Sequence, residues 1–452
     1  MVKKKIIKFF IIIFVFILGI SFVLGWKIVD GNYDKQNKTI LFLKEIIPNS
    51  ISRKIRDTIF IIPDLKTLNK DLSLQVKKYE QELNGQLFEE KIINSGNITT
   101  SLKNFFLPFP RLDVRAGYES TVNRSRAHYL EIIKDKILVI SGEGKTIFFD
   151  KKNIFEKKLN QVEIQNNLKE LVETSNNKLA GIRDLLYKND KIYISVIVFN
   201  ENKGYSFNIY FANLNFNKIN FELFLETKTY FKNWSVSSGG RLEGFGENKL
   251  LLSYGFSGVK GSAQDKKSLL GKIVSIDLLT KTLEIISLGH RNPQGLQFIE
   301  NKNLIINSEH GPKGGDEINF NYLKDTKKPN FGWDLASYGI SYDGTDPYKK
   351  SHKDNGFDEP FKFFTPSIGI SEIFFLNKHE SFLNKNILVV SSLRAGSLYV
   401  LELDDQLKKI EKETRINFGN ERIRDLKFDY DLGNFYLIFE MTPSIAVVKI
   451  KS

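Results

Sequence analysis

The chain of 452 residues contains no cysteine, and this absence removes several classes of chemistry at once. Without thiols there are no disulfides, no thiolate nucleophile, no iron–sulfur ligands and no cysteine-bound zinc. An oxidising compartment is therefore tolerated, but it is not demonstrated. Methionine is also scarce, with 2 residues against 37 phenylalanines. This skew and the abundance of lysine are consistent with a biased nucleotide composition of the genome. The excess of lysine alone therefore does not indicate a site that binds an anionic partner.

The sequence also lacks a concentrated stretch of positive charge. The formal net charge is +13, and residues 1–100 carry a disproportionate share of it. The remaining excess is spread thinly along the rest of the chain. A protein that binds nucleic acid is expected to show a dense basic stripe or a known module, and the sequence has neither. The sequence therefore argues against a nucleic-acid partner.

One long apolar run lies near the N-terminus. The 18 residues from Phe9 to Trp26 carry no charge and are preceded by lysines. This length spans a bilayer, and the basic residues before the run place the N-terminus in the cytoplasm. We predict that residues 1–30 are a single-pass anchor in the cytoplasmic membrane, with the C-terminal domain in the periplasm. A cleaved signal peptide is the alternative, although residues 21–25 lack a small-x-small cleavage pattern.

A helical stalk or linker is predicted over residues 31–104. The pattern is clearest after Pro63, where apolar side chains recur every three or four residues up to Tyr79. It lasts barely two heptads, so a solvated spacer explains it at least as well as a coiled-coil interface. No oligomeric state follows from this segment.

After Phe105 the sequence changes to short β-branched and aromatic runs separated by turn residues. Examples of the runs are Ile137–Ile140, Ile192–Val196 and Asn386–Val390. Turn signals such as Asn189-Asp190, 246–248 and 429–431 lie between such runs. The pattern predicts an all-β domain over residues 105–452, and this length favours a β-propeller over a sandwich or a barrel.

Several motifs are far more specific than composition. They read LGHRNPQGL at 288–296, SEHGPKGGDEIN at 308–319, NFGW at 330–333, SYGISYDGT at 337–345, FTPSI at 364–368, SLRAG at 392–396 and RIRD at 422–425. In this order they resemble the signature of the PQQ-dependent soluble glucose and aldose sugar dehydrogenases. The resemblance covers about residues 175–450 and is strongest from 270 to 400. It implies a six-bladed β-propeller that carries PQQ on its axis.

The resemblance also implies a cofactor site. PQQ has three carboxylates and an ortho-quinone, so its host needs several cationic groups and a cation that polarises the quinone oxygen. The residues that match the family's cofactor and quinone contacts are Arg291, Asn292, Gln294, Arg394, Arg422 and Arg424. Gly311 and Pro312 match the positions whose backbone carbonyls hold a cofactor-bound Ca²⁺, an ion that prefers hard oxygen ligands. Without the context of these motifs, each arginine would be interpreted as a surface residue that forms an exposed ion pair.

The acidic residues near these glycines have a second interpretation. Glu309, Asp316 and Glu317 resemble a carboxylate metal cluster or a glycosidase acid pair. We favour a structural role for Asp316 and Glu317, which would hold the loop at Gly314 and Gly315. For His310, a position lining the site and a plain loop position are both open.

The expected catalytic base is missing. In the family a histidine precedes an arginine by four residues in an H-x-x-x-R-L segment, and the matching stretch SSGGRL at 237–242 places Ser237 there. A serine hydroxyl without a partner cannot hold a proton at neutral pH, and loss of a positioned base costs about 10²–10⁴ in rate. Ile182 and Phe256 also fall near a family glutamine and a family aspartate. His128 matches no family motif, so we interpret it as an ordinary strand or loop residue, with substitution for the base as the alternative.

Two functions from different classes therefore remain. The first is a PQQ- and calcium-dependent oxidoreductase that oxidises an aldose sugar or another alcohol, with an unidentified electron acceptor. The second is a catalytically disabled propeller that binds a carbohydrate or a protein at the membrane, including a purely structural envelope protein. The arginines and Gly311-Pro312 favour the first, whereas Ser237 favours the second.

Overall fold

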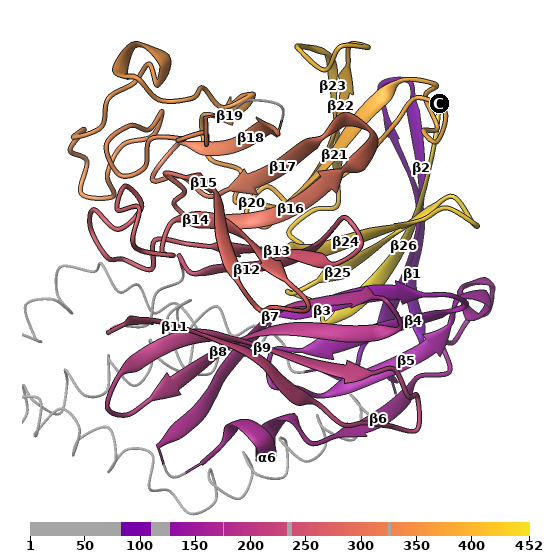
Figure 1. Cartoon of the computed structure of the whole chain (residues 1–452). Coiled ribbons are helices and arrows are strands. Elements are labelled where there is room, and N and C mark those ends of the chain that lie inside the picture. The colour runs from indigo at the N-terminus through magenta and orange to yellow at the C-terminus, as the bar shows by residue number, and fades with distance from the viewer. Residues whose placement is uncertain (1–82, 110–126, 175, 233–236, 324–326) are drawn as a thin grey trace, which may run out of the picture. The chain divides into compact units, whose positions relative to one another are not determined.

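The computed structural model describes residues 83–109, 127–174, 176–232, 237–323 and 327–452. The strands in these ranges form six separate sheets of four or five strands. The innermost strands of neighbouring sheets contact one another in a closed cycle, so the sheets are blades around one axis (Figure 1). The prediction of a six-bladed β-propeller is confirmed. The inner strands are, in order, β3 (His128–Ile133), β7 (Asn177–Lys188), β12 (Gly239–Phe245), β16 (Pro293–Ile299), β20 (Ile370–Leu376) and β24 (Ile423–Asp429).

Each blade continues outward as an antiparallel meander. The second strands are β4 (Lys136–Ser141), β8 (Lys191–Asn200), β13 (Lys249–Tyr254), β17 (Leu304–Glu309), β21 (Asn386–Ser392) and β25 (Asn434–Phe439). The third strands are β5 (Thr146–Asp150), β9 (Gly204–Asn213), β14 (Lys272–Asp277), β18 (Asp316–Tyr322), β22 (Ser397–Leu403) and β26 (Ser444–Lys451). The strands further out in the first five blades are β6 (Val162–Asn166), β10 (Lys218–Ile219), β11 (Glu222–Phe231), β15 (Leu283–Leu288), β19 (Lys362–Phe364) and β23 (Ile410–Asn417).

The ring is closed by strands from both ends of the described chain. β1 (Leu87–Ser95) and β2 (Ile98–Phe106) form a hairpin, and β2 pairs antiparallel with β26. Figure 1 shows these indigo strands beside the yellow C-terminal strand. The sixth blade is therefore shared between the N-terminal and C-terminal parts of the propeller, which hold each other in register through backbone hydrogen bonds.

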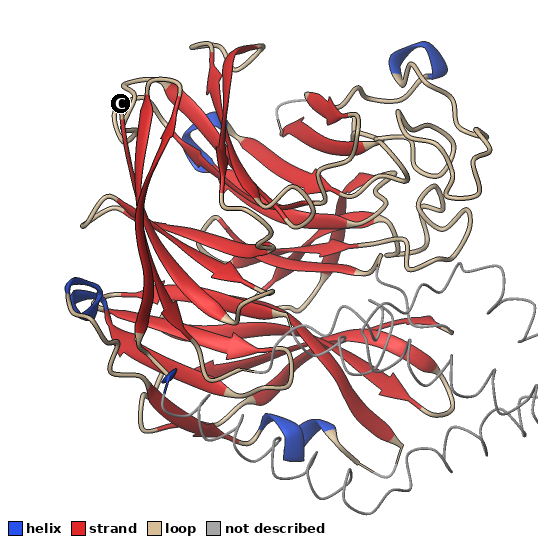
Figure 2. Ribbon diagram, turned by 180° about the vertical axis from the view of Figure 1, so that it is seen from behind, coloured by secondary structure: helices blue, strands red, loops and turns tan. Residues whose placement is uncertain are grey.

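Helices contribute little to this architecture (Figure 2). The α-helix α6 (Leu168–Val172) follows β6, and short 3-10 turns cover Lys151–Phe155, Glu300–Lys302 and Lys353–Asn355. Among the described residues, no helix is both long and apolar enough to cross a membrane. The predicted anchor, residues 1–30, lies outside the described residues, as does the predicted stalk up to residue 82.

The last part of the predicted stalk is wrong. Residues 87–106 are strands of the sixth blade, and the compact unit begins at Leu83 rather than at residue 105. The reason is visible in the burial of β1, whose side chains alternate between half-buried and exposed as expected for an outer strand. Such a strand covers the blade on one side only, so its sequence lacks the apolar run that marks the inner strands.

Buried apolar side chains fill every interface between neighbouring blades. Six separate clusters are present, one at each interface of the ring. For example, Val389 of the fifth blade and Leu437 of the sixth belong to one cluster. The middle strands are covered on both faces, which explains their continuous apolar sequences. The predicted turn at Asn189-Asp190 is also present, because both residues have positive φ, as a tight two-residue hairpin between β7 and β8 requires.

Candidate active site on the propeller axis

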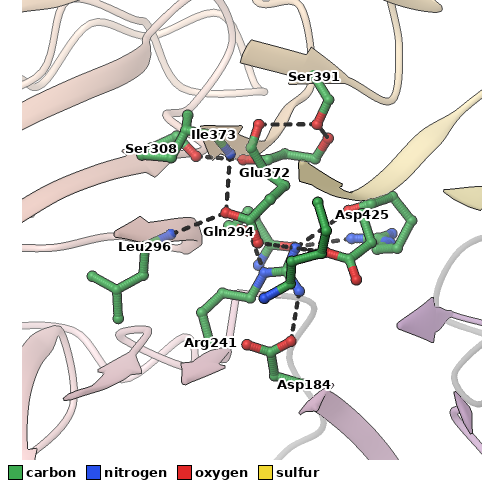
Figure 3. Close-up of polar contacts among 12 residues, drawn as sticks. Asp184, Arg241, Gln294, Leu296, Ser308, Glu372, Ile373, Ser391 and Asp425 are labelled. Atoms are coloured by element: carbon green, nitrogen blue, oxygen red, sulfur yellow. Dashed lines mark hydrogen bonds and ion pairs between the residues drawn. The ribbon is translucent and has the colours of Figure 1, made fainter. Parts of the chain in front are cut away.

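Arg241 of β12 lies at the centre of the ring and contacts the other five inner strands. Its guanidinium forms ion pairs with Asp184 of β7 (2.9 Å), Asp425 of β24 (2.8 Å) and Glu372 of β20 (Figure 3). Its Nε donates a hydrogen bond of 2.6 Å to the backbone oxygen of Gln294 in β16. The ring of Tyr129 in β3 lies 5.1 Å from the guanidinium carbon. We call Arg241 with its three carboxylates the axial hub.

The axial hub is buried, and its charges are strongly coupled. Arg241 and Asp184 are each only 3% exposed. Burial alone lowers the pKa of Arg241, but Glu372, Asp184 and Asp425 outweigh this and raise it. Burial raises the pKa of Glu372 to about 7, with Arg241 opposing the shift, and burial likewise raises the pKa of Asp184. One guanidinium therefore faces more carboxylate charge than it neutralises.

The axial hub divides the axis into two ends. Residues that precede the hub on their strands, such as Asn292 before Gln294 and Arg422 before Asp425, lie at one end, which we call the cofactor end. The side chain of Asn292 accepts a hydrogen bond of 3.1 Å from the amide of Gly239 and one of 3.0 Å from Gln294 Nε2. Gln294 Oε1 in turn accepts a hydrogen bond of 3.0 Å from Arg424. The structure thus brings together Asn292, Gln294 and Arg424, which the sequence analysis had grouped.

Arg291 is fixed at the cofactor end by groups on both sides. Its backbone amide donates to Glu309 Oε2 (2.6 Å), and its guanidinium donates to the backbone oxygen of His310 (3.0 Å). The guanidinium carbon also lies 5.9 Å from the ring centre of Phe256 and 5.1 Å from that of Trp333. The Nε atom of Arg291 is buried and has no hydrogen-bond partner among the described residues. A buried donor of this kind favours an anionic or polar ligand beside it.

Glu309 has a structural role. Its Oε1 atom lies 2.9 Å from His290 Nδ1 and accepts a hydrogen bond of 2.6 Å from Asn319. Its other oxygen holds the amide of Arg291. Both carboxylate oxygens are therefore occupied by protein groups, which argues against the glycosidase and metal-cluster readings of this residue.

Three further arginines belong to the predicted site. Arg422 and Arg424 both pair with Glu440, at 3.1 Å and 2.6 Å. These two guanidiniums outweigh the effect of burial and hold the pKa of Glu440 at about 2. Arg394 lies in the turn between β21 and β22, where it is exposed, and its guanidinium forms no ion pair with any described residue. Arg291, like Arg394, forms no ion pair with a carboxylate among the described residues, whereas Arg424 pairs with Glu440.

The Gly311-Pro312 turn is tightly built. A Cβ atom on Gly311 would lie 1.7 Å from the backbone oxygen of Gly315, so only glycine fits there. Asp316 accepts hydrogen bonds from the amides of Gly311 (3.3 Å), Gly369 (2.7 Å) and Ile370 (3.0 Å). Asp316 therefore has a structural role, but it binds the amides of Gly311, Gly369 and Ile370 and not, as we had expected, those of Gly314 and Gly315. Within the described ranges no group of three or more acidic or histidine side chains is placed to hold a metal, so a cation here depends on backbone oxygens.

Glu317 does not hold the glycine loop as expected. Its carboxylate lies 3.8 Å from Nε2 of the buried His352, and burial raises its pKa well above the usual range. The amides of Gly314 and Gly315 instead donate to the hydroxyl of Ser367, at 2.9 Å and 3.1 Å. His310 is partly exposed next to this loop, with Nδ1 at 3.8 Å from Asp316.

A sequence model described as glucose/sorbosone dehydrogenase matches residues 130–446. The chain belongs to this family. The aldose sugar dehydrogenase YliI of Escherichia coli (strain K12) is 31% identical over 215 residues, which cover 44% of this chain and 56% of that protein. An uncharacterised protein of Synechocystis, slr1608, is 28% identical over 225 residues, covering 44% of this chain and 52% of the relative. The chain thus spans about half the length of the curated relatives that it matches.

Solved structures agree with the fold. A crystal structure of glucose dehydrogenase superposes with a TM-score of 0.59 and 22% identity, covering 72% of this chain and 96% of the other. A PQQ-bound aldose sugar dehydrogenase from Streptomyces coelicolor gives a TM-score of 0.54 and 17% identity, with 73% and 94% covered. At these sequence identities the structural similarity shows that the chain has the propeller fold, and it shows nothing about the chemistry of the site.

Membership of the glucose/sorbosone dehydrogenase family makes the position of Ser237 important. Ser237 is buried and lies two residues before Gly239, whose amide is bound by Asn292. Its backbone oxygen accepts a hydrogen bond of 2.9 Å from the amide of Ser257. Ser237 is thus located at the cofactor end, in the neighbourhood of Asn292.

The other two positions that depart from the family pattern, Ile182 and Phe256, lie in different parts of the propeller. Ile182 is fully buried in the cluster between the first two blades and does not line the cofactor end. Phe256 does line it, because its ring faces the guanidinium of Arg291. His128 is fully buried at the start of β3 and packs against Phe109, with ring centres 4.6 Å apart. This burial agrees with our interpretation of His128 as an ordinary strand residue.

The sequence analysis missed the axial hub and Glu440. A signal for the hub is nevertheless present, because Ile-Arg-Asp-Leu occurs twice, at 182–185 in β7 and at 423–426 in β24. In both copies the aspartate interrupts an inner strand and pairs with Arg241. Burying an unpaired carboxylate in an apolar strand is costly in free energy. An aspartate that occurs at the same position of two such strands therefore indicates that both aspartates pair with the same cation.

Replacing Glu440 with glutamine is expected to reduce the free energy of unfolding by about 3 kcal/mol at pH 7, because the folded carboxylate has a pKa of about 2. A depressed folded pKa stabilises the protein above the unfolded pKa, and this contribution is lost as the pH falls toward the folded pKa. The difference between the two proteins should therefore shrink to roughly half at pH 3. Urea unfolding at both pH values measures this difference. Glu411→Gln, which removes an exposed ion pair with Lys385, serves as the control and should change stability by less than about 1 kcal/mol.

Proposed function

We propose that this chain is a PQQ-dependent oxidoreductase that oxidises an aldose sugar or another alcohol at the cofactor end of the propeller axis. The observation that carries the proposal is the buried Nε of Arg291, which has no hydrogen-bond partner among the described residues, in a guanidinium that lies over the rings of Phe256 and Trp333. Arg291 and Arg394 add to it, since neither guanidinium forms an ion pair with a carboxylate in the part of the chain that the structure describes, whereas Arg424 pairs with Glu440. This surplus of positive charge suits a ligand with three carboxylates.

The residues present therefore fit PQQ, which when bound supplies an acceptor for the hydride of the substrate carbon. Arg291, Asn292 and Gln294 would contact the cofactor and the reacting oxygen, and Arg394, Arg422 and Arg424 would pair with its carboxylates. Trp333 and Phe256 keep water away from the guanidinium of Arg291. Gly311 and Pro312 would offer backbone oxygens to Ca²⁺, a ligand type that this ion accepts.

Among the described residues, Ser237, Glu309 and Glu440 do not provide an acceptor for the proton of the substrate hydroxyl. Ser237 cannot take it at neutral pH, Glu309 is saturated by hydrogen bonds, and Glu440 is held by two arginines. This observation favours a second candidate function, in which the propeller keeps its ligand site but binds a carbohydrate or a protein without oxidising it. As a further part of the proposal, residues 1–30 anchor the propeller to the cytoplasmic membrane on its periplasmic side.

The deciding experiment titrates the full-length protein with PQQ in the presence of Ca²⁺, follows cofactor absorbance, and then adds a panel of aldoses. Stoichiometric binding followed by bleaching supports the oxidoreductase. Binding without bleaching favours the second candidate, and no binding refutes the assignment of PQQ.

Replacing Arg291 with methionine should weaken PQQ binding about 10- to 100-fold, because a hydrogen bond to a charged group contributes about 1.5–3 kcal/mol. The same absorbance titration measures this loss. Arg415→Met is the matched control, because Arg415 lies on the outer strand β23, where it donates hydrogen bonds to Ser397 and Ala395. The Arg415→Met variant should bind PQQ with the affinity of the wild type. Equal affinities of the Arg291 variant and the control would contradict the proposed role of Arg291.

A further inference from the structure

A second pocket lies on the axis at the end opposite to Arg291. It is formed by residues that follow the axial hub on the inner strands, and its volume is about 470 Å³. This volume is in the range of small-ligand sites. We call it the far-end pocket. All six inner strands contribute to it, through Glu131 of β3, Leu186 of β7, Glu243 of β12, Gln297 of β16, Phe374 of β20 and Lys427 of β24.

Most charges around the far-end pocket are paired. Lys427 donates to Glu131 at 3.2 Å, and both side chains are largely buried. The largely buried Lys151 pairs with the buried Asp429 at 3.0 Å and with the exposed Asp431 at 2.8 Å. In total the pocket is lined by four carboxylates and three lysines, so one carboxylate is in excess.

Glu243 is the carboxylate left over. It forms no ion pair and no hydrogen bond with any residue in the part of the chain that the structure describes. The charged groups that act on it from the other strands are Lys427, Glu131, Glu372 and Asp184. Burial raises the pKa of Glu243 to about 8, with Lys427 opposing the shift and the three carboxylates adding to it. The pocket therefore contains a carboxyl group that a cationic partner would stabilise in its ionised form.

The remaining walls are apolar and aromatic. Leu186, Leu296 and Ile373 lie on three different inner strands, and Phe374 adds an aromatic face. Tyr430 is 58% exposed at the rim, and its ring packs edge-on against Phe428 at 5.1 Å. Apolar walls with one unsatisfied charge match a ligand that has an apolar body and a single cationic group, and tyrosine rings also favour cations.

We propose that the far-end pocket binds a small organic ammonium ion, with its ammonium group at Glu243 and its apolar body against Leu186, Leu296 and Phe374. This site is separate from the cofactor end, because the buried axial hub lies between the two ends of the axis. The proposal does not depend on PQQ binding.

The test is calorimetric titration of the full-length protein with phenethylammonium chloride. We expect saturable binding of one ion per chain. The neutral probe 3-phenyl-1-propanol, which has a similar body and no charge, should bind at least about tenfold more weakly, because it cannot form a charge-assisted hydrogen bond with Glu243.

Binding should also release protons. At pH 7 Glu243 is largely protonated, and the bound ammonium group favours its ionised form, so up to one proton is released per ion bound. The heat of binding should therefore differ between phosphate and Tris buffers at pH 7, and this difference should fade by pH 9.

Glu243→Gln should lose at least about tenfold in affinity for phenethylammonium and should lose the proton release. Since the glutamine is neutral like the protonated carboxyl, the fold should persist, which a thermal melt verifies. The matched control Glu163→Gln changes an exposed carboxylate that pairs with Lys145 and should behave as wild type. No saturable binding by the wild type, equal affinity for the neutral probe, or unchanged affinity in Glu243→Gln would each overturn the proposal.

Discussion

Replacing Ser237 with histidine is expected to raise the rate of aldose oxidation by about 10²–10⁴, because the imidazole is a proton acceptor at neutral pH and the serine hydroxyl is not. Ser237 is located where an imidazole would be close to Asn292, since the amide of Gly239 two residues later is bound by the Asn292 side chain. The measurement is the rate of aldose oxidation by the PQQ- and Ca²⁺-loaded protein across pH 5–9. In the variant, the rate should rise with pH through the pKa of the new imidazole, whose ordinary value is about 6.5.

The control for this variant is Lys260→His, which adds an imidazole at an exposed position of the loop after Phe256. Its rate and its pH profile should equal those of the wild type. If Ser237→His binds PQQ normally but oxidises no faster, the missing base is not what limits the reaction. The second candidate function, a propeller that binds without oxidising, would then be favoured.

Replacing Arg241 with methionine is expected to destabilise the protein by about 3–5 kcal/mol at pH 8, because it leaves Asp184, Glu372 and Asp425 buried without their common partner. The loss should be smaller at pH 5. Burial raises the pKa values of Glu372 and Asp184, so these carboxyls become protonated as the pH falls, and a neutral carboxyl costs less to bury than an unpaired charge.

Urea unfolding at pH 8 and pH 5 measures both parts of this prediction. Arg415→Met removes an arginine of the outer strand β23, which donates to Ser397 and Ala395, and should cost only about 1 kcal/mol at either pH. A loss below about 1 kcal/mol for Arg241→Met at pH 8 would show that the axial hub contributes little to holding the inner strands together.

The axial hub also explains how one end of the axis is kept distinct from the other. Arg241 fills the centre of the ring and contacts the other five inner strands, so the cofactor end and the far-end pocket are separate sites with different electrostatics. At the cofactor end, Arg291 and Arg394 form no ion pair with a described carboxylate, whereas the described lining of the far-end pocket has one carboxylate more than it has lysines. The two ends therefore suit ligands of opposite charge.

The sequence by itself determined the fold class and indicated several residues that lie at the cofactor end, although not Glu440. Short apolar runs with turn residues between them, such as Asn189-Asp190, specify strands and hairpins locally, so the all-β architecture follows from neighbouring residues. The motifs around Arg291, Asn292 and Gly311 lie within single turns or strand ends, and the structure keeps Arg291, Asn292 and Gln294 together. The absence of the expected histidine at Ser237 was also evident from the sequence.

Only the tertiary structure decided which distant groups meet. The outer strands β1 and β2 were taken for part of a stalk, because their role depends on pairing with β26 at the other end of the chain. Asp184, Glu372 and Asp425 come from three blades, and nothing local to any of them indicates that Arg241 is their partner. The unsatisfied carboxyl of Glu243 likewise exists only because six strands converge. These features depend on contacts between residues far apart in the chain, and burial of charge along the axis determines their energies.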